Sequence, residues 1–341
     1  MRCSTASVIA RASLPILTRL NPELAHDLGL AGLRWLRPLL LPQRYSAALS
    51  VDCFGLKFAH PLGLAAGFDK NADCLDALGA MGFSHVELGT VTPRPQPGNP
   101  KPRMFRIPAA GALINRMGFN NKGVDHLVAQ VSRSRYRGIR GVSIGKNADT
   151  PLDHAHNDYV TCLRKVYAVA DYVAVNISSP NTAGLRELQT REGLQRILGA
   201  VLEERGVLQE RYGKRVPVLV KVAPDLSPEQ IAALAREFRA FQVDGVIATN
   251  TSTERTGLVI GPAAESGGLS GAPLHPLSVK VISQLRRELG DHFPLIGVGG
   301  ILCASDARAT LKAGANLIQI YTGFAYRGPA LLEEIIKALS A

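Results

Sequence analysis

Residues 216–250 read VPVLVKVAPDLSPEQIAALAREFRAFQVDGVIATN, and this stretch predicts the fold of the chain. Residues 216–222 and 244–248 are short, almost continuous apolar runs, which is typical of strands buried on both faces. Between them the tripeptide 227–229 (SPE) combines a capping serine, a first-turn proline and an early acidic residue, so we expect a helix over 227–239. The stretch is therefore predicted to form a strand, helix and strand of a parallel sheet.

The same alternation of apolar runs and helical stretches extends from about residue 61 to the end of the chain. The sequence contains eight apolar runs, at 61–68, 85–91, 141–145, 171–177, 216–222, 244–248, 294–298 and 316–321. Eight strand and helix units predict an α/β fold of the TIM (β/α)8 barrel type, and a doubly wound sheet is the alternative. We expect the barrel to occupy residues 46–341, after a small N-terminal helical extension over 1–45.

Polar or glycine residues follow the carboxyl end of each predicted strand. They are Asp69, Lys70, Thr90, Lys146, Asn147, Asn176, Lys221, Thr249, Asn250, Thr251, Gly299, Gly300, Tyr321 and Thr322. Any one of them alone fits a strand cap or a loop hydrogen bond. In a barrel, however, all of these strand ends open into one mouth, where the active sites of such barrels lie. The agreement of eight strand ends favours a site there.

Two long insertions interrupt the alternation, at 92–140 and 251–275. Both exceed the usual length of a connection between strand and helix. Long loops on the functional face commonly serve as lids or as walls of a substrate site. The alternative is a disordered surface loop, which would leave Met117 and Phe119 exposed to water.

The N-terminal extension, residues 1–45, has leucines at helical spacing with arginines between them, and Asn21 marks the start of a second helix. Six arginines against Glu23 and Asp27 give it a net charge of +4, which suits an anionic membrane surface. The alternative is a helical cap packed on the barrel. Arginine and proline interrupt any signal-peptide core, and no linker or spanning helix follows, as a mitochondrial presequence would require.

Composition excludes several classes of protein. With 46% hydrophobic and 20% charged residues, the 341-residue chain is not expected to be disordered. Its apolar runs are too short to span a membrane. The net charge of +11 favours anionic partners. Five scattered cysteines without a Cys-x-x-Cys pair predict neither a metal site nor a disulfide framework, and a reducing, cytosol-facing compartment fits them.

The last two predicted strand ends suggest a phosphate site. Gly299 and Gly300 allow close approach of the backbone to an anion, and the Thr322 hydroxyl can donate to it, although a tight turn explains the glycines equally well. FMN is a cofactor of this kind. Lys221, inside an apolar strand, is costly to bury without an anionic partner and would supply the fixed cation that a reduced flavin requires. Asn147 offers an amide for the edge of a heterocycle.

The segment 176–182 (NISSPNT) places hydroxyls and amides just after the fourth predicted strand. No hydrolase triad spacing or nucleophile elbow accompanies Ser179, so a nucleophilic serine is a poor interpretation. A serine can still relay a proton from an acidified carbon, though it is an unusual base. Serine and asparagine in a loop more often only form turns.

Six motifs together resemble the dihydroorotate dehydrogenase family in order and spacing. They are 66–71 (AGFDKN), 89–99 (GTVTPRPQPGN), 115–121 (NRMGFNN), 176–182 (NISSPNT), 221–225 (KVAPD) and 249–251 (TNT). The chain is most similar to the quinone-dependent class 2 enzymes of bacteria, which carry a helical N-terminal extension. Class 1 enzymes lack the extension and typically use cysteine where this sequence has Ser179.

The resemblance implies oxidation of dihydroorotate to orotate in pyrimidine synthesis, with Ser179 as the base for the C5 proton and hydride transfer from C6 to one FMN per chain. The residues that it implies for FMN are Ala66, Gly67, Phe68, Asp69, Lys70, Thr90, Asn147, Asn176, Lys221, Thr249, Gly271, Gly300, Tyr321 and Thr322. Those implied for dihydroorotate are Lys70, Asn115, Arg116, Met117, Gly118, Phe119, Asn176, Asn181, Asn250 and Thr251.

The resemblance also implies reoxidation by a membrane quinone that enters between the N-terminal helices and reaches the flavin near His26, Arg106 and Tyr321. The enzyme would then lie peripherally on the cytoplasmic side of the inner cell membrane. The sequence does not fix an oligomeric state, and a monomer is our expectation.

Three other interpretations stay open on the residues alone. A different flavin barrel would share the glycine loops but not 115–121 or 176–182. A nucleic-acid binder has only the net charge in its favour, without a recognisable binding motif, and we expect no such partner. A purely structural membrane-surface protein needs the helical extension but not six polar motifs at strand ends.

Overall fold

The computed structural model describes the chain except residues 1–4, 41–46, 183, 256–257, 259–263 and 341. Two of the six arginines counted in the N-terminal extension, Arg2 and Arg44, and one of the five cysteines, Cys3, lie outside the described residues.

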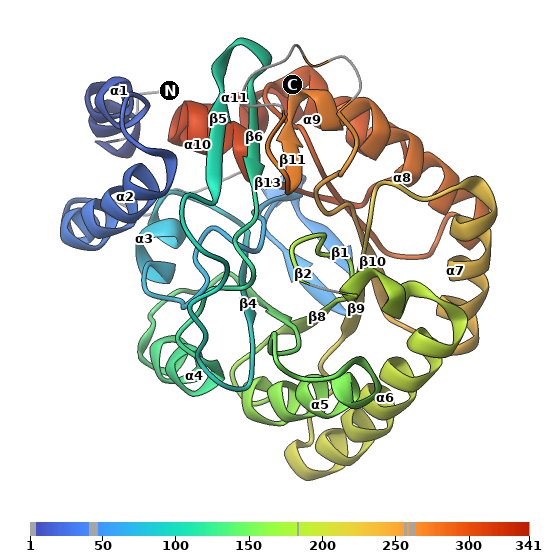
Figure 1. The fold of residues 1–341 in the computed structure, drawn as a ribbon. Helices are drawn as coiled ribbons and strands as arrows, with labels where there is room; N and C mark the ends of the chain where they lie inside the picture. Colours follow the sequence, from blue (N-terminus) through green and yellow to red (C-terminus); the bar gives the residue numbers. More distant parts are fainter. Residues whose placement is uncertain (1–4, 41–46, 183, 256–257, 259–263, 341) are drawn as a thin grey trace.

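Eight parallel strands form a closed barrel at the centre of the molecule (Figure 1). They are β3 Leu62–Leu64, β4 His85–Val91, β7 Ile139–Ile144, β8 Tyr172–Asn176, β9 Val218–Val222, β10 Gly245–Ala248, β12 Leu295–Val298 and β13 Leu317–Ile320. The barrel closes where β13 pairs with β3, so that Ile318 lies opposite Leu62. All eight predicted strands are confirmed, and the barrel prediction with them.

Helices follow the strands and surround the barrel. They are α3 Leu75–Ala80, α4 Val124–Arg133, α5 Ala155–Val166, α6 Arg191–Tyr212, α7 Pro228–Ala240, α8 His275–Leu289, α9 Ala304–Lys312, α10 Thr322–Arg327 and α11 Pro329–Leu339. The predicted start of α7 is confirmed, because the Ser227 side chain accepts from the Gln230 N–H and the Gln230 side chain accepts from the Ser227 N–H. Short 3-10 turns occur at Arg37–Leu39, Ala47–Leu49, Pro108–Ala110, Leu152–His154, Leu185–Gln189 and Ala272–Leu274.

Buried side chains, both apolar and polar, fill the barrel interior, and a hairpin packs against the amino ends of the strands. The hairpin consists of β1 Val51–Cys53 and β2 Leu56–Phe58. The ring of Phe58 contacts the ring of His85, at the start of β4, with centroids 5.2 Å apart. This end of the barrel is therefore packed, and the opposite, carboxyl end is available for a site.

The two insertions meet over that carboxyl end, which we call the mouth. β5 Met104–Ile107 and β6 Ala112–Asn115 come from the first insertion, and β11 Gly268–Gly271 from the second. They form an antiparallel sheet in which β6 pairs with both other strands. Met117 is buried, so this part of the first insertion is a packed wall rather than the disordered loop of the alternative interpretation.

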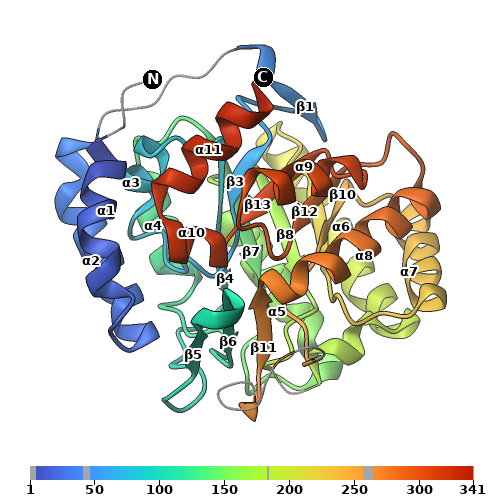
Figure 2. The ribbon, with the colours of Figure 1, turned by 90° about the horizontal axis from the view of Figure 1, so that it is seen from above.

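Two helices of the N-terminal extension, α1 Thr5–Leu17 and α2 Pro22–Leu36, lie side by side against the outside of the barrel (Figures 1 and 2). The Asn21 side chain caps α2, as predicted, by accepting from the N–H groups of Glu23 and Leu24. α1 packs against α11, and α2 packs against α3 and β5. Ile16, Leu24, Leu28 and Trp35 nevertheless remain exposed, Trp35 to 85%. The pair thus both caps the barrel and presents apolar surface.

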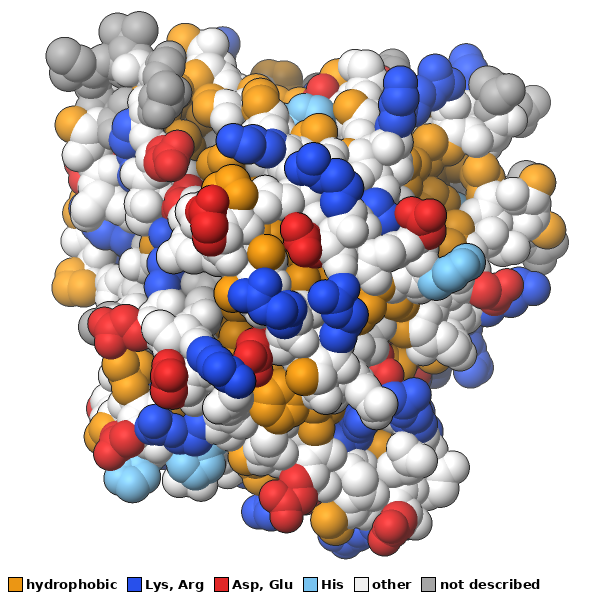
Figure 3. Space-filling model, turned by 90° about the vertical axis from the view of Figure 1, so that its right-hand side faces the viewer, with side chains coloured by type: hydrophobic (Ala, Val, Ile, Leu, Met, Phe, Trp, Pro, Cys, Tyr) orange, Lys and Arg blue, Asp and Glu red, His pale blue; other side chains and the backbone are white. Residues whose placement is uncertain are grey.

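In the described part of the chain, no helix combines the length and the apolar character that a membrane span requires. Figure 3 shows one face of the molecule, on which Lys and Arg side chains are interspersed with Asp and Glu. A continuous basic stripe is the pattern expected for binding nucleic acid. The excess of positive charge does not form such a stripe on that face.

Candidate active site

A cavity of about 140 Å³ opens at the mouth, and residues from strand ends and both insertions line it. We call it the mouth cavity. The predicted site residues in its wall are Ala66, Gly67, Lys70, Thr90, Asn115, Met117, Gly118, Phe119, Asn176, Ser179, Asn181, Lys221, Thr249, Asn250, Thr251, Gly300, Tyr321 and Thr322. Closure of the barrel brings these residues together from widely separated parts of the sequence.

Five of the residues predicted for FMN or dihydroorotate do not line this cavity. Asp69 lies beneath it and accepts hydrogen bonds from the backbone N–H groups of Asp73 and Cys74, at 2.9 and 2.8 Å. Burial raises the pKa of Asp69 to about 6. The Asn147 side chain accepts from the Arg94 N–H at 3.1 Å and donates to the Arg94 carbonyl at 3.0 Å. Asp69 and Asn147 therefore hold loops behind the wall.

The other three also lie elsewhere. The Arg116 guanidinium pairs with Glu265 at 2.7 Å and lies over the Phe105 ring, away from the mouth cavity. Phe68 faces a second cavity described below. Gly271 supports the wall from behind, since a Cβ on Gly300 would lie 2.6 Å from the Gly271 carbonyl oxygen.

Neutral hydrogen bonds join the side chains at the ends of β4, β8 and β10. Asn176 donates to the Thr90 hydroxyl at 2.8 Å, and Asn250 donates to the side-chain amide oxygen of Asn176 at 3.3 Å. Asn250 also donates to the Ser178 hydroxyl at 3.1 Å. The network fixes the orientation of the two amides, so that their remaining groups can read the edge of a planar ligand.

Ser179 is buried on the loop after β8, with its hydroxyl at the cavity wall. The Asn181 N–H donates to this hydroxyl at 3.3 Å. The Asn181 side chain donates to Asn115 at 3.2 Å, which ties the loop to the first insertion. No hydrogen bond from a described His, Asp or Glu reaches the Ser179 hydroxyl, so its surroundings differ from those of a triad nucleophile.

Glycines and hydroxyls form the end of the cavity between β12 and β13. Gly300 has a φ of +69°, and a Cβ there would also meet the His275 backbone nitrogen at 2.6 Å, so only glycine fits. The Thr322 hydroxyl donates to the Ser270 hydroxyl at 2.9 Å. The sequence analysis did not select Ser270 or the other lining residues Ala65, Leu274, Val298, Ile301 and Gln319. Ser270 became part of the wall only because β11 pairs with β6, a long-range contact.

Lys221 has an anionic partner that the sequence analysis did not identify. Its ammonium lies 3.6 Å from Glu87 of β4, and both side chains are buried. Glu87 is the acidic residue inside the apolar run 85–91, and its position there is the feature of the sequence that could have identified it. A buried charge in a strand requires a partner, but the run does not indicate which strand supplies it.

Lys70 lies at the cavity wall on the loop after β3. Burial lowers the pKa of its ammonium to about 8, and the positive charge of Arg103 acts in the same direction. Lys70 is therefore charged at neutral pH and offers an incompletely compensated cation to an anionic ligand. Among the described residues, no cluster of His, Cys, Asp and Glu has the composition of a metal site.

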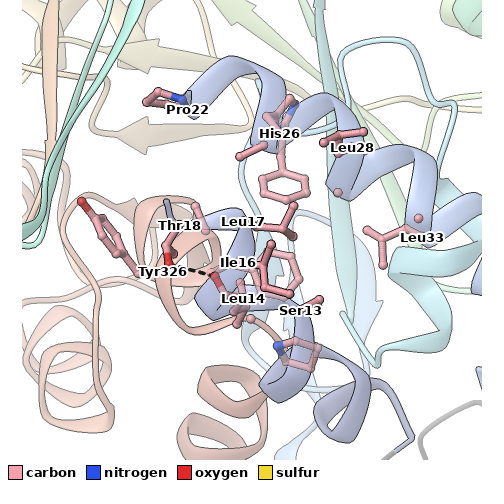
Figure 4. Close-up of a pocket in the computed structure, with 18 of the residues that line it drawn as sticks. Ser13, Leu14, Ile16, Leu17, Thr18, Pro22, His26, Leu28, Leu33 and Tyr326 are labelled. Carbon is pink, nitrogen blue, oxygen red and sulfur yellow. Dashed lines mark hydrogen bonds between the residues drawn. The ribbon is translucent and has the colours of Figure 1, made fainter. Parts of the chain in front are cut away.

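A second cavity, of about 350 Å³, lies between the N-terminal helices and the barrel, and we call it the helix cavity. Figure 4 shows side chains of α1 and α2 on its two sides, among them Leu14, Leu17, His26 and Leu33. Most of the lining is aliphatic or aromatic. Its shape and apolar lining suit a hydrophobic ligand rather than a charged one.

The structure places all three predicted acceptor-site residues in the wall of the helix cavity. Burial lowers the pKa of His26 to about 3, so the imidazole is neutral. Arg106 donates to the carbonyls of Thr18 and Leu20, at 2.7 and 3.0 Å, where α1 ends. Tyr321 lines both cavities, and its hydroxyl donates to the Gly67 carbonyl at 3.3 Å. Tyr321 is thus the one described residue that the walls of the two cavities share.

Fold and site together define a (β/α)8-barrel enzyme with a polar cavity at the mouth and an apolar cavity beneath an N-terminal helical pair. The chain belongs to the dihydroorotate dehydrogenase family, whose model matches residues 48–341. The family resemblance seen in the motifs is thereby confirmed.

Known relatives match nearly the whole chain. A dihydroorotate dehydrogenase (quinone) of Alkalilimnicola ehrlichii is 53% identical over 96% of this chain and 97% of its own length. A relative of the same description from Flavobacterium lutescens is 55% identical over 93% of this chain and 89% of its own. A crystal structure of DHODH from Eimeria tenella in complex with ferulenol is 38% identical, with a TM-score of 0.87 over 96% of this chain and 93% of that one.

Proposed function

We propose that this protein oxidises dihydroorotate to orotate at the mouth cavity and passes the electron pair to a membrane quinone in the helix cavity. One observation carries the proposal: Tyr321 belongs to the walls of both cavities, so two chemically different reactants can be held on either side of one residue. The polar cavity suits an anionic heterocycle and the apolar one suits a quinone. Both cavities are built within one chain, so the proposal requires no second copy.

The residues at the mouth fit FMN. Lys221 has no hydrogen-bond acceptor for its ammonium within the described residues, and the amide oxygen of Gln319 is buried without a partner. The end with Gly300, Ser270 and Thr322 offers close backbone approach to a phosphate, and the two hydroxyls, which here donate to Leu113 and to Ser270, would rotate to donate to it. Lys221 would hold the ring edge, and Asn176 and Thr90 would support it. Bound there, FMN would accept the hydride from C6 of dihydroorotate and deliver the electron pair to the quinone.

Dihydroorotate would occupy the part of the cavity formed by Lys70, Asn115, Asn181, Asn250 and Thr251. The Lys70 ammonium would bind its carboxylate, and the amides would orient its ring. The Ser179 hydroxyl would relay the proton from C5: its oxygen would accept that proton while its own O–H proton passes to water. Because Asn181 donates to that hydroxyl, the Ser179 oxygen has a fixed position from which its remaining lone pair can accept the proton.

The quinone ring would lie near neutral His26 and the Arg106 guanidinium, with its apolar chain between α1 and α2. Exposed Ile16, Leu24, Leu28 and Trp35 support peripheral attachment of these helices to a membrane, and the family resemblance implies its cytoplasmic side. Arg19, Arg34 and Arg37 on the same segment favour an anionic surface.

An anaerobic visible spectrum of the purified protein tests both half-reactions. We expect dihydroorotate to bleach a flavin band and a soluble quinone to restore it. A flavin that dihydroorotate leaves oxidised would refute the substrate assignment. Bleaching that no quinone reverses would refute the acceptor assignment.

A further inference from the structure

A buried hydrogen-bonded group lies beneath the mouth cavity, and the proposed reaction does not use it. One carboxylate oxygen of Glu87 accepts from the Tyr172 hydroxyl at 3.1 Å and from the Gln319 amide at 2.8 Å. The Gln319 amide also donates to the Tyr172 hydroxyl, at 3.2 Å. All three side chains have no exposed surface, and they come from β4, β8 and β13. They form a rigid support inside the barrel.

The second carboxylate oxygen of Glu87 accepts no hydrogen bond in the described part of the chain. It lies 3.6 Å from the Lys221 ammonium, so the two groups attract as charges without a hydrogen bond. Lys221 and Gln319 line the mouth cavity, whereas Glu87 and Tyr172 do not. The ammonium therefore has its anionic partner on one side and keeps its N–H groups for a ligand on the other.

Burial makes this carboxylate electrostatically important. Charges a few ångströms apart inside a protein interact far more strongly than in water, because little solvent screens them. Glu87 has a negative charge close to Lys221 and reduces the positive potential that Lys221 presents to the cavity. Reduction of a flavin adds negative charge near N1 of its ring, so this potential affects how readily a bound flavin is reduced.

We propose that Glu87 is a positioning residue that fixes the Lys221 ammonium at the FMN site and lowers the reduction potential of the flavin. The inference rests on the proposed function, because it requires FMN at the mouth. A lower potential opposes reduction by the substrate and favours transfer of the electron pair to the acceptor. Glu87 thus adjusts the balance between the two half-reactions without touching either reactant.

The test is the reduction potential of the holoprotein with Glu87→Gln, measured by anaerobic titration against a reference dye. The substitution keeps the size of the side chain and removes the charge. We expect the ratio of reduced to oxidised flavin at a fixed dye potential to rise by at least about tenfold. Flavin reduction by dihydroorotate should become faster, and reoxidation by a soluble quinone slower.

Two further variants separate charge from damage to the fold. Glu87→Asp keeps the charge but moves it away from Lys221. Its ratio of reduced to oxidised flavin should therefore lie between those of the wild type and Glu87→Gln. Asp244→Asn is the matched control, because Asp244 is another carboxylate paired with cations, Arg205 and Arg215 at 2.7 and 2.6 Å, with its side chain only 9% exposed, at the opposite end of the barrel. It should lower the melting temperature and leave the flavin potential unchanged.

Failure of this inference and failure of the proposed function give different results. A wild-type apoprotein that does not quench the fluorescence of added FMN would refute the proposed function and this inference together. FMN bound by Glu87→Gln at the wild-type potential would refute the role of Glu87 alone. If Glu87→Gln does not fold, the reduction potential of the flavin in Glu87→Asp tests the inference instead. A wild-type potential in that variant would refute the inference.

Discussion

The carboxylate of Glu23 in α2 lies 2.8 Å from a terminal nitrogen of the Arg103 guanidinium, and both side chains are buried. Arg103 also donates to the carbonyls of Pro97 and Asn99, at 2.6 and 2.8 Å. The Asn99 side chain in turn donates to the Asn181 carbonyl at 3.1 Å. A continuous set of contacts therefore joins the helix that lines the helix cavity to the loop that holds Ser179.

Substitution of Glu23 by alanine should loosen α2. Removal of one partner of a buried ion pair costs about 3 kcal/mol, because it leaves the other charge unpaired. Amide hydrogen exchange within Pro22–Leu36 should accelerate by about a hundredfold. Lys101→Ala removes the exposed partner of the same carboxylate and should change exchange by less than about threefold. Equal effects of the two variants would contradict the importance of the buried pair.

The pH dependence of substrate capture should report on Lys70. Its folded-state pKa of about 8 is below the ordinary value of 10.5, so the ammonium is charged below about pH 8 and neutral above it. We expect kcat/KM for dihydroorotate to fall as the pH rises through about 8, since the free enzyme loses the cation that binds the carboxylate. In Lys70→Arg the guanidinium stays charged, and this fall should disappear. A fall at the same pH in that variant would assign it to another group.

Ser179→Ala should slow flavin reduction by dihydroorotate by about a hundredfold or more, which is the usual contribution of a positioned base. Stopped-flow absorbance of the flavin band measures this rate directly. Bound FMN and reoxidation by a quinone should not change. Ser178→Ala is the control: its hydroxyl contacts Asn176 and Asn250 but does not line the cavity, so its effect should be smaller. A larger effect at Ser178 would refute the base assignment.

Trp35→Glu should weaken binding to vesicles that contain anionic lipid, because Trp35 is 85% exposed on α2. Sedimentation with vesicles measures the bound fraction. Val207→Glu places the same charge on α6, at a side chain that is 56% exposed. This control should leave vesicle binding unchanged. If both variants lose binding equally, net charge rather than the N-terminal helices determines attachment.

The strand pattern predicted most of the fold, because the barrel strands are buried on both faces and leave almost continuous apolar runs in the sequence. The largest difference in length is at the first run, predicted over 61–68 and observed as Leu62–Leu64. The end of that run leaves the barrel ladder to form the cavity wall, where Gly67 has a φ of +96°. Apolar composition persists there because Ala65, whose N–H still donates to the Ile320 carbonyl of β13 at 3.1 Å, and Phe68 are both buried.

Side-chain partnerships were not predictable in the same way. Glu87 and Gln319 are 232 residues apart and meet only because the barrel closes. Asn147 and Asp69 follow strands as the site residues do, yet they bond to backbone groups behind the wall. Position at a strand end predicts proximity to the mouth, whereas the direction of a side chain depends on loops whose course the sequence pattern does not specify.

Tyr321 in the shared wall has a consequence for enzyme kinetics under the proposed function. Dihydroorotate would enter the mouth cavity from the aqueous phase, and the quinone would enter the helix cavity from the bilayer. Neither reactant would have to leave before the other binds. The two reactants should therefore not compete for one binding site. An inhibitor of the helix cavity would stall the enzyme with its reducing substrate still free to enter.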